Sequence, residues 1–183
     1  MAVSFRQAEQ YLYYFPIRLK QWQDRILELY TLRQETDCHA QNYEASHASQ
    51  GTHSEPVASY YAKIEAAEFA CDSLAVRVIP IMRLRNFLKN ASSERYRVMH
   101  LVMELKYFEG FTLGYIAHQT HKAEKTISRR RYELIDLTID ELERGVFDYE
   151  LECYYGSYPS AGNDWPVSGA VPADPSSESL GQS

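Results

Sequence analysis

The sequence has little of what fixes a protein in a membrane or an oxidising compartment. Its three cysteines, Cys38, Cys71 and Cys153, are odd in number and widely spaced, which argues against a disulfide framework and a four-thiolate zinc site. No apolar run is long enough to span a bilayer, and the first residues lack the basic start and apolar middle of a signal peptide. We therefore expect a cytoplasmic protein that does not associate with membranes.

Motifs for catalysis are also missing. The chain contains no glycine-rich phosphate loop, no paired-carboxylate motif and no nucleophile with a partner histidine at a recognisable spacing. Cys38, His39, His47 and His53 fall in one polar stretch, but their spacings match no zinc pattern. The sequence therefore predicts a protein that is not an enzyme, with no metal and no cofactor.

Positive charge is scarce overall but concentrated in one segment. The net charge of the chain is −6. Residues 1–91 carry ten basic and ten acidic side chains, residues 92–135 carry eight and five, and residues 136–183 carry one and ten. Because charges are screened over about 8 Å, a local surplus matters more at a binding surface than the total. The middle segment is therefore a candidate for binding an anionic partner.

The N-terminal half has the spacing of amphipathic helices. From residue 17 to residue 33, apolar positions recur at steps of three and four, and the same spacing returns after Pro56. The polar residues 35–55 lack this periodicity and predict a connection between the two helices. Pro80 predicts a kink or a split in the second helix. We expect residues 1–91 to form an amphipathic helical hairpin that needs burial from a second copy or from the next domain, and hence a homodimer.

Three shorter helices are expected in residues 92–145. Ser92 or Ser93 fits the start of the first of them, and Gly110 fits its end. Thr112 caps a short helix, and the last helix runs from about residue 123 to residue 144. Residues 146–183 are acidic and rich in Gly, Pro and Ser, which predicts a disordered tail. The expected fold class is therefore all-α.

The spacing of the last two helices is typical of a helix-turn-helix. Such a motif needs a small residue on its first helix, a residue that tolerates an unusual turn conformation four positions later, and an apolar residue six positions beyond. Ala117, His121 and Ile127 stand at these places. His is among the non-glycine residues enriched at positive φ. Residues 92–145 are therefore predicted to form a helix-turn-helix DNA-binding domain.

With Ile127 facing the core, the opposite side of the last helix faces the major groove. Lys125 and Arg129 are suited to donate to the acceptor edge of guanine, and Glu124 is suited to accept from cytosine. The remaining predicted DNA-binding residues are Ser128 on the same face, Lys122, Thr126 and Arg131 for phosphates, and Arg130, whose stem lies along the core edge unless the helix rotates. The alternative is that these basic residues form an ordinary solvated face of a helical bundle and bind no DNA.

The segment "LKYFEGFTLGYIAHQTHKAEKTISRRR" resembles the helix-turn-helix of region four of sigma factors. The wider layout of residues 10–142 resembles the ArpU/RinA-type regulators of phages and prophages of Gram-positive bacteria. This resemblance implies binding to double-stranded DNA and control of late phage genes. Alternatives are a small terminase subunit that recognises DNA for packaging and a sigma-like adaptor that docks on RNA polymerase. For the acidic tail, either competition with DNA or docking on a protein partner remains open.

Overall fold

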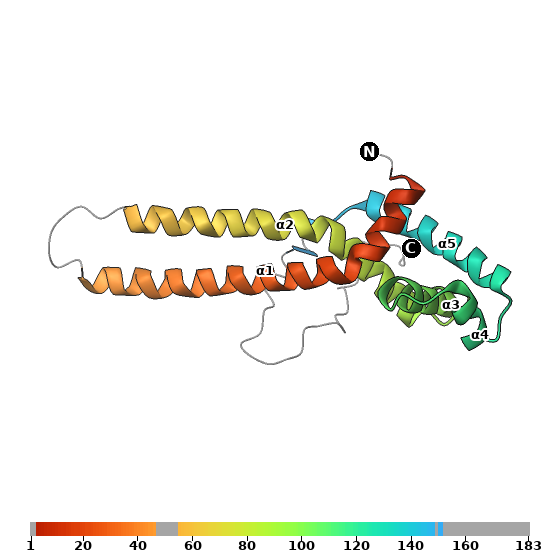
Figure 1. The fold of residues 1–183 in the computed structure, drawn as a ribbon. Helices are drawn as coiled ribbons and strands as arrows, with labels where there is room; N and C mark the ends of the chain where they lie inside the picture. The colour runs from red at the N-terminus through yellow and green to blue at the C-terminus, as the bar shows by residue number, and fades with distance from the viewer. Residues whose placement is uncertain (1–2, 47–54, 149, 152–183) are drawn as a thin grey trace, which may run out of the picture. The chain divides into compact units, whose positions relative to one another are not determined.

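The computed structural model describes residues 3–46, 55–148 and 150–151, and within these ranges the chain forms helices and no strand. The chain divides into two units with the boundary between Val146 and Phe147, and the first of them is compact. The elements of the first unit are drawn in Figure 1; in chain order they are α1 (Phe5–Ser46), α2 (Glu55–Asn90), α3 (Glu94–Val102), the π-helical segment η1 (Met103–Phe108), α4 (Leu113–Gln119) and α5 (Glu124–Arg144). The all-α fold class predicted from the sequence is confirmed.

Helices α1 and α2 form the predicted hairpin and lie side by side in Figure 1. Each buries an apolar stripe with steps of three and four, so the two stripes meet along the hairpin. Nearer to the C-terminal end of α1, Arg33 forms an ion pair with Glu68 of α2, with 2.7 Å between the nitrogen and the oxygen. The buried residues of the stripes include Leu12, Phe15, Trp22, Ile26 and Leu29 on α1 and Cys71, Ala75, Val78 and Ile79 on α2.

Helix α1 is longer at both ends than the sequence periodicity predicted. It begins at Phe5 because Ser4 and Gln7 form reciprocal contacts at its start: the Ser4 amide donates to Gln7 Oε1 at 2.9 Å, and the Gln7 amide donates to Ser4 Oγ at 3.4 Å. Pro16 therefore lies inside the helix rather than in its first turn. Figure 1 shows the N-terminal part of α1 turning away from the line of the remainder, as a proline favours.

The predicted connection over residues 35–55 is wrong in extent, because α1 continues to Ser46. No Gly or Pro occurs between Arg33 and Ser46. Residues other than Gly and Pro cost a helix less than about 0.7 kcal/mol each relative to Ala. A helix that has already formed can therefore continue without an apolar stripe. Lack of periodicity was therefore a poor signal for a loop here.

Pro80 does not split α2, which runs from Glu55 to Asn90, but α2 bends where its colour passes from yellow to green in Figure 1, in keeping with the predicted kink. A proline inside a helix costs about 3 kcal/mol through its lost hydrogen bond and its clash with the preceding turn. The neighbours Val78, Ile79 and Ile81 are all buried, and each such side chain contributes about 1.5–3 kcal/mol. Packing of this part of α2 therefore outweighs the local cost of the proline.

The last four elements pack against one another, and α3 and α5 also pack against α2. Helix α3 passes directly into η1, whose end is set by Gly110 at φ 82°, the predicted helix stop. The predicted cap Thr112 accepts a hydrogen bond from the Tyr115 amide at 3.2 Å and so starts α4. Arg83 of α2 binds Glu141 of α5, which fastens the hairpin to α5.

No helix in the described part of the chain is both long and apolar enough to cross a membrane. The predicted boundary at residue 91 coincides with the turn between α2 and α3, although both sides belong to one compact unit. The tail predicted for residues 146–183 falls mostly outside the described residues, as does the part of the predicted connection over residues 47–54.

Candidate nucleic-acid interface

The turn between α4 and α5 comprises residues 120–123. His121 has φ 51°, so the positive φ predicted for this residue is confirmed. The Lys122 amide donates to the Ala117 carbonyl at 3.0 Å, and Thr120 Oγ1 donates to the Ile116 carbonyl at 2.8 Å. These hydrogen bonds close the turn over the end of α4 and fix where α5 begins.

The phase of α5 is set by residues buried on one side. Ile127, Leu134 and Ile135 are fully buried, and Ala117 of α4 is nearly so. The sequence-based expectation that Ala117 and Ile127 face the core is therefore confirmed. Because α5 is anchored on this side, the opposite side of its first two turns faces solvent.

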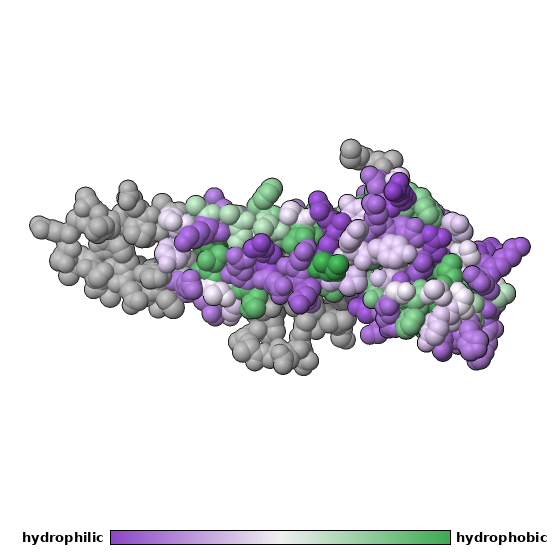
Figure 2. All heavy atoms as spheres, viewed as in Figure 1, coloured by the Kyte–Doolittle hydropathy of each residue, from purple (hydrophilic) through white to green (hydrophobic). Residues whose placement is uncertain are grey.

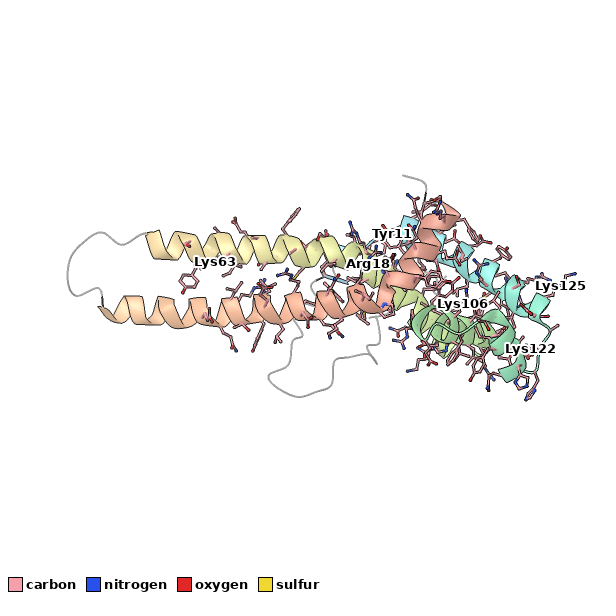
Figure 3. All side chains as sticks on the ribbon, viewed as in Figure 1. Tyr11, Arg18, Lys63, Lys106, Lys122 and Lys125 are labelled. Atoms are coloured by element: carbon pink, nitrogen blue, oxygen red, sulfur yellow. The ribbon has the colours of Figure 1, made fainter. Side chains whose placement is uncertain are left out.

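Three of the four residues predicted on this outer side are exposed. Glu124 and Lys125 lie in the first turn of α5, and the Arg129 side chain is 76% exposed; Ser128 is half-buried. Figure 3 shows Lys125 extending outward from the start of α5, with Lys122 in the turn beside it. Helix α5 thus presents two cations to solvent, Lys125 from its first turn and Arg129 from its second.

Arg129 is held by a carboxylate that also binds two other arginines. Its Nε lies 3.1 Å from Glu133 Oε1, while the Nε of Arg95 on α3 lies 3.0 Å from Glu133 Oε2 and Arg130 binds the same oxygen. One carboxylate therefore faces three guanidinium groups. The cluster keeps an excess of positive charge, and Glu133 orients the arginines without neutralising them all.

Glu133 is ionised because of these partners. Its side chain is only 17% exposed, and this burial opposes the charged form, but hydrogen bonds from Arg130 and Arg95 outweigh the burial and lower its pKa below the ordinary value. The carboxylate can therefore accept from the arginines throughout the physiological pH range.

Lys122 and Thr126 lie beside the turn. The Lys122 ammonium is 2.6 Å from Glu94 Oε1, and this hydrogen bond lowers the pKa of the exposed Glu94 carboxyl. Thr126 is half-buried, and its amide donates to the Ala123 carbonyl at 2.8 Å. Lys122 thus sits at the rim of the exposed face with an acidic neighbour that a phosphate would have to displace.

Arg130 has its stem at the core edge, with its guanidinium on Glu133; Ile127 stays buried, so α5 has not rotated. Arg131 points elsewhere. Its Nε donates to Glu9 Oε1 at 3.0 Å and to the Tyr107 hydroxyl at 3.3 Å, and its side chain is 18% exposed. Phosphate binding by Arg131 stays a prediction, but these contacts turn the side chain towards α1.

Two features of this region were not predicted. Arg95 joins the Glu133 cluster from α3, and Phe111 stacks on Tyr115 with ring centroids 4.3 Å apart at the start of α4. The exposed Tyr115 lies three residues after the polar cap Thr112, and the sequence alone shows this spacing. For Arg95 the only available signal was its place in the basic segment, because a pair 38 residues apart leaves no local pattern.

Among the described residues, no group of three or more His, Cys, Asp or Glu side chains is placed to hold a metal ion. The residues that the structure brings together are instead the cations of α5 and α3 around one carboxylate. Comparison of the chain with protein-family models, curated proteins and solved structures found no match.

Proposed function

We propose that the protein is a sequence-specific regulator of transcription that binds double-stranded DNA through a helix-turn-helix formed by α4 and α5. The observation that carries this proposal is the outer face of α5, where Lys125 and Arg129 project from the two turns that follow a tight turn at His121. A helix of this kind fits the major groove, and its first residues reach base edges.

The contacts divide into two kinds. In this proposal Arg129, oriented by Glu133, reads a base together with Lys125, and Lys122 and Arg95 bind phosphates. The resemblance of the sequence to ArpU/RinA-type regulators supports late genes of a phage or prophage as the targets. Two copies of the chain, each with one such face, would add their contacts on one operator.

The test begins with selection of bound sequences from random double-stranded DNA by the full-length protein. On the selected site, Arg129→Ala should weaken binding by about 1–3 kcal/mol and flatten the preference at one base pair, because a bidentate contact to guanine is lost. Binding is measured by fluorescence anisotropy at fixed salt.

Arg25→Ala is the matched control, because Arg25 is an exposed, ion-paired arginine on α1 far from α5 in sequence. It should leave both affinity and preference unchanged. Unaltered affinity and preference in Arg129→Ala would show that α5 does not read DNA in this way. Failure of the selection to enrich any sequence would favour an adaptor that docks on RNA polymerase.

A further inference from the structure

Helix α2 carries a second stripe, on the side opposite the one that packs on α1. Its positions again advance by four and three residues, the spacing of a coiled-coil seam. The stripe has five residues, and all of them are exposed in the structure; the exposed fraction of Phe69 is 76%. We call the stripe the outer seam; it consists of Ala62, Ala66, Phe69, Ser73 and Val76.

The outer seam can be buried at little polar cost. It holds no charged residue, and its one hydroxyl, Ser73 Oγ, already donates to the Ala70 carbonyl at 2.9 Å. The view in Figure 2 shows hydrophobic residues reaching the surface of the hairpin among hydrophilic ones. A large apolar side chain such as Phe69 gains about 1.5–3 kcal/mol on burial, so this surface favours a partner.

The charges beside the outer seam differ on its two sides. Glu65 and Asp72 flank it on one side, and Lys63 and Arg77 flank it on the other. In a parallel coiled coil, the flank of one helix meets the opposite flank of its partner, whereas in an antiparallel one like flanks meet. In a parallel pair, a residue on one flank meets the partner residue five positions later, so Asp72 of each copy would lie against Arg77 of the other.

We propose that the outer seam binds the outer seam of a second copy of this chain, with the two α2 helices parallel. The occupant follows from the charge pattern, which is complementary to itself in this orientation alone. Because α2 is already folded against α1, association has no helix to form. Parallel pairing also brings the two copies of α5 to the same end of the dimer.

The first experiment measures the mass of the full-length protein by sedimentation velocity over a range of micromolar concentrations, without DNA. The wild type should show a reversible monomer–dimer equilibrium. Phe69→Glu and Val76→Glu should each raise the dissociation constant about ten-fold or more, because each buries an unpaired charge. Leu27→Glu is the control: Leu27 is 52% exposed on α1, outside the outer seam, and this variant should dimerise like the wild type.

Thermal unfolding of each variant checks that the hairpin is intact, since exposed positions contribute little to it. A wild type that stays monomeric, as it would if another segment of the chain covered the outer seam, overturns the proposal. A Phe69→Glu protein that dimerises normally also overturns it. Because the assay contains no DNA, its outcome is separate from that of the proposed function.

Cross-linking tests the orientation. The cross-linking variants are made in a full-length protein carrying Cys38→Ser and Cys153→Ser. Cys71 is kept, because its burial raises the pKa of the thiol to about 11 and keeps it unreactive. Ala62→Cys and Val76→Cys are introduced separately and treated with a short bis-maleimide. Parallel helices place each residue beside its own copy, so both variants should cross-link.

An antiparallel pair brings at most one of these two positions next to its own copy. Cross-linking at one position only, or at neither, would therefore overturn the parallel arrangement. Leu27→Cys serves as the control for random collision and should give no cross-linked dimer above background.

Discussion

Glu133 is the residue on which the behaviour of the basic cluster depends. It binds Arg129, Arg130 and Arg95 from two helices, so it sets the direction of the proposed base reader as well as the local charge. Charge-assisted hydrogen bonds of this kind are directional, and loss of the acceptor leaves the arginine free to adopt other rotamers.

We predict that Glu133→Gln strengthens binding to unrelated DNA and weakens the preference at the base pair that Arg129 contacts. The added positive charge favours phosphates, and the salt slope should steepen by roughly one unit. The same variant should lose part of the dependence of stability on pH. Because the folded-state pKa of Glu133 is lowered, its contribution is present above the pKa of the unfolded chain and disappears as pH falls through the folded-state pKa.

Anisotropy titrations at several salt concentrations and urea unfolding across a pH series measure the two effects. Glu28→Gln, on the exposed face of α1, is the control and should change neither. An unchanged salt slope together with an unchanged acid limb would mean that the Glu133 cluster does not form in solution.

At the scale of elements, the turn before α5 is the most demanding part of the backbone. His121 occupies a left-handed conformation that costs a residue with a side chain about 1–2 kcal/mol. We predict that His121→Gly unfolds at the same or higher urea concentration than the wild type, whereas His121→Val loses about 1–2 kcal/mol. DNA affinity should fall with His121→Val, because the turn places α5.

His118→Val is the matched control, since His118 is also exposed but lies within α4 in helical conformation. It should cost only the difference in helix propensity, less than about 0.7 kcal/mol. Equal stability of His121→Val and the wild type would contradict the positive φ described for this position.

Elements with a strong repeating pattern were predictable from the sequence, and those fixed by single contacts were not. The stripes of α1 and α2 and the cap at Thr112 repeat local rules, so they were found. The start of α1 depends on the reciprocal hydrogen bonds between Ser4 and Gln7, which precede the periodic region. The continuation of α1 to Ser46 has no apolar period, so its sequence predicts a connection where the structure has a helix.

The same difference applies to the candidate site. The exposed face of α5 follows from the phase of Ile127 alone, and the structure places Lys125 and Arg129 on it. The direction of Arg131 depends on Glu9, which lies 122 residues earlier in the chain. No local pattern encodes a pair at that separation, so the inward turn of Arg131 could not be predicted.

At the scale of the whole molecule, charge is separated along the chain. Residues 92–135 are net positive, and residues 146–183 carry six acidic side chains and no basic one. An anionic segment tethered near the proposed DNA-binding face would compete with phosphates at high effective concentration. It mimics charge but not base edges, so it should suppress binding to random DNA more than binding to the preferred site.

We predict that truncation after Gly156, within the part of the chain that the structure does not describe, tightens binding to random DNA and leaves the thermal unfolding midpoint unchanged. Anisotropy and circular dichroism measure the two quantities. If the segment instead docks on a protein partner through Tyr158 and Trp165, DNA affinity should stay constant while transcriptional activity is lost. A lower unfolding midpoint would show that the removed residues stabilise the fold.

If the proposed function holds, the contacts between α5 and the hairpin restrict the spacing of the DNA half-sites. Arg131 binds Glu9 of α1, and Arg83 of α2 binds Glu141, so α5 is fastened at two points to the hairpin whose helix α2 carries the outer seam. Two copies joined along that seam would hold their α5 helices at a set separation. One turn of the duplex spans about 10 base pairs, so half-sites moved by half a turn would face opposite sides of the DNA. If the protein binds DNA as such a dimer, moving the half-sites by half a turn should abolish binding, and its binding sites should share one helical phase.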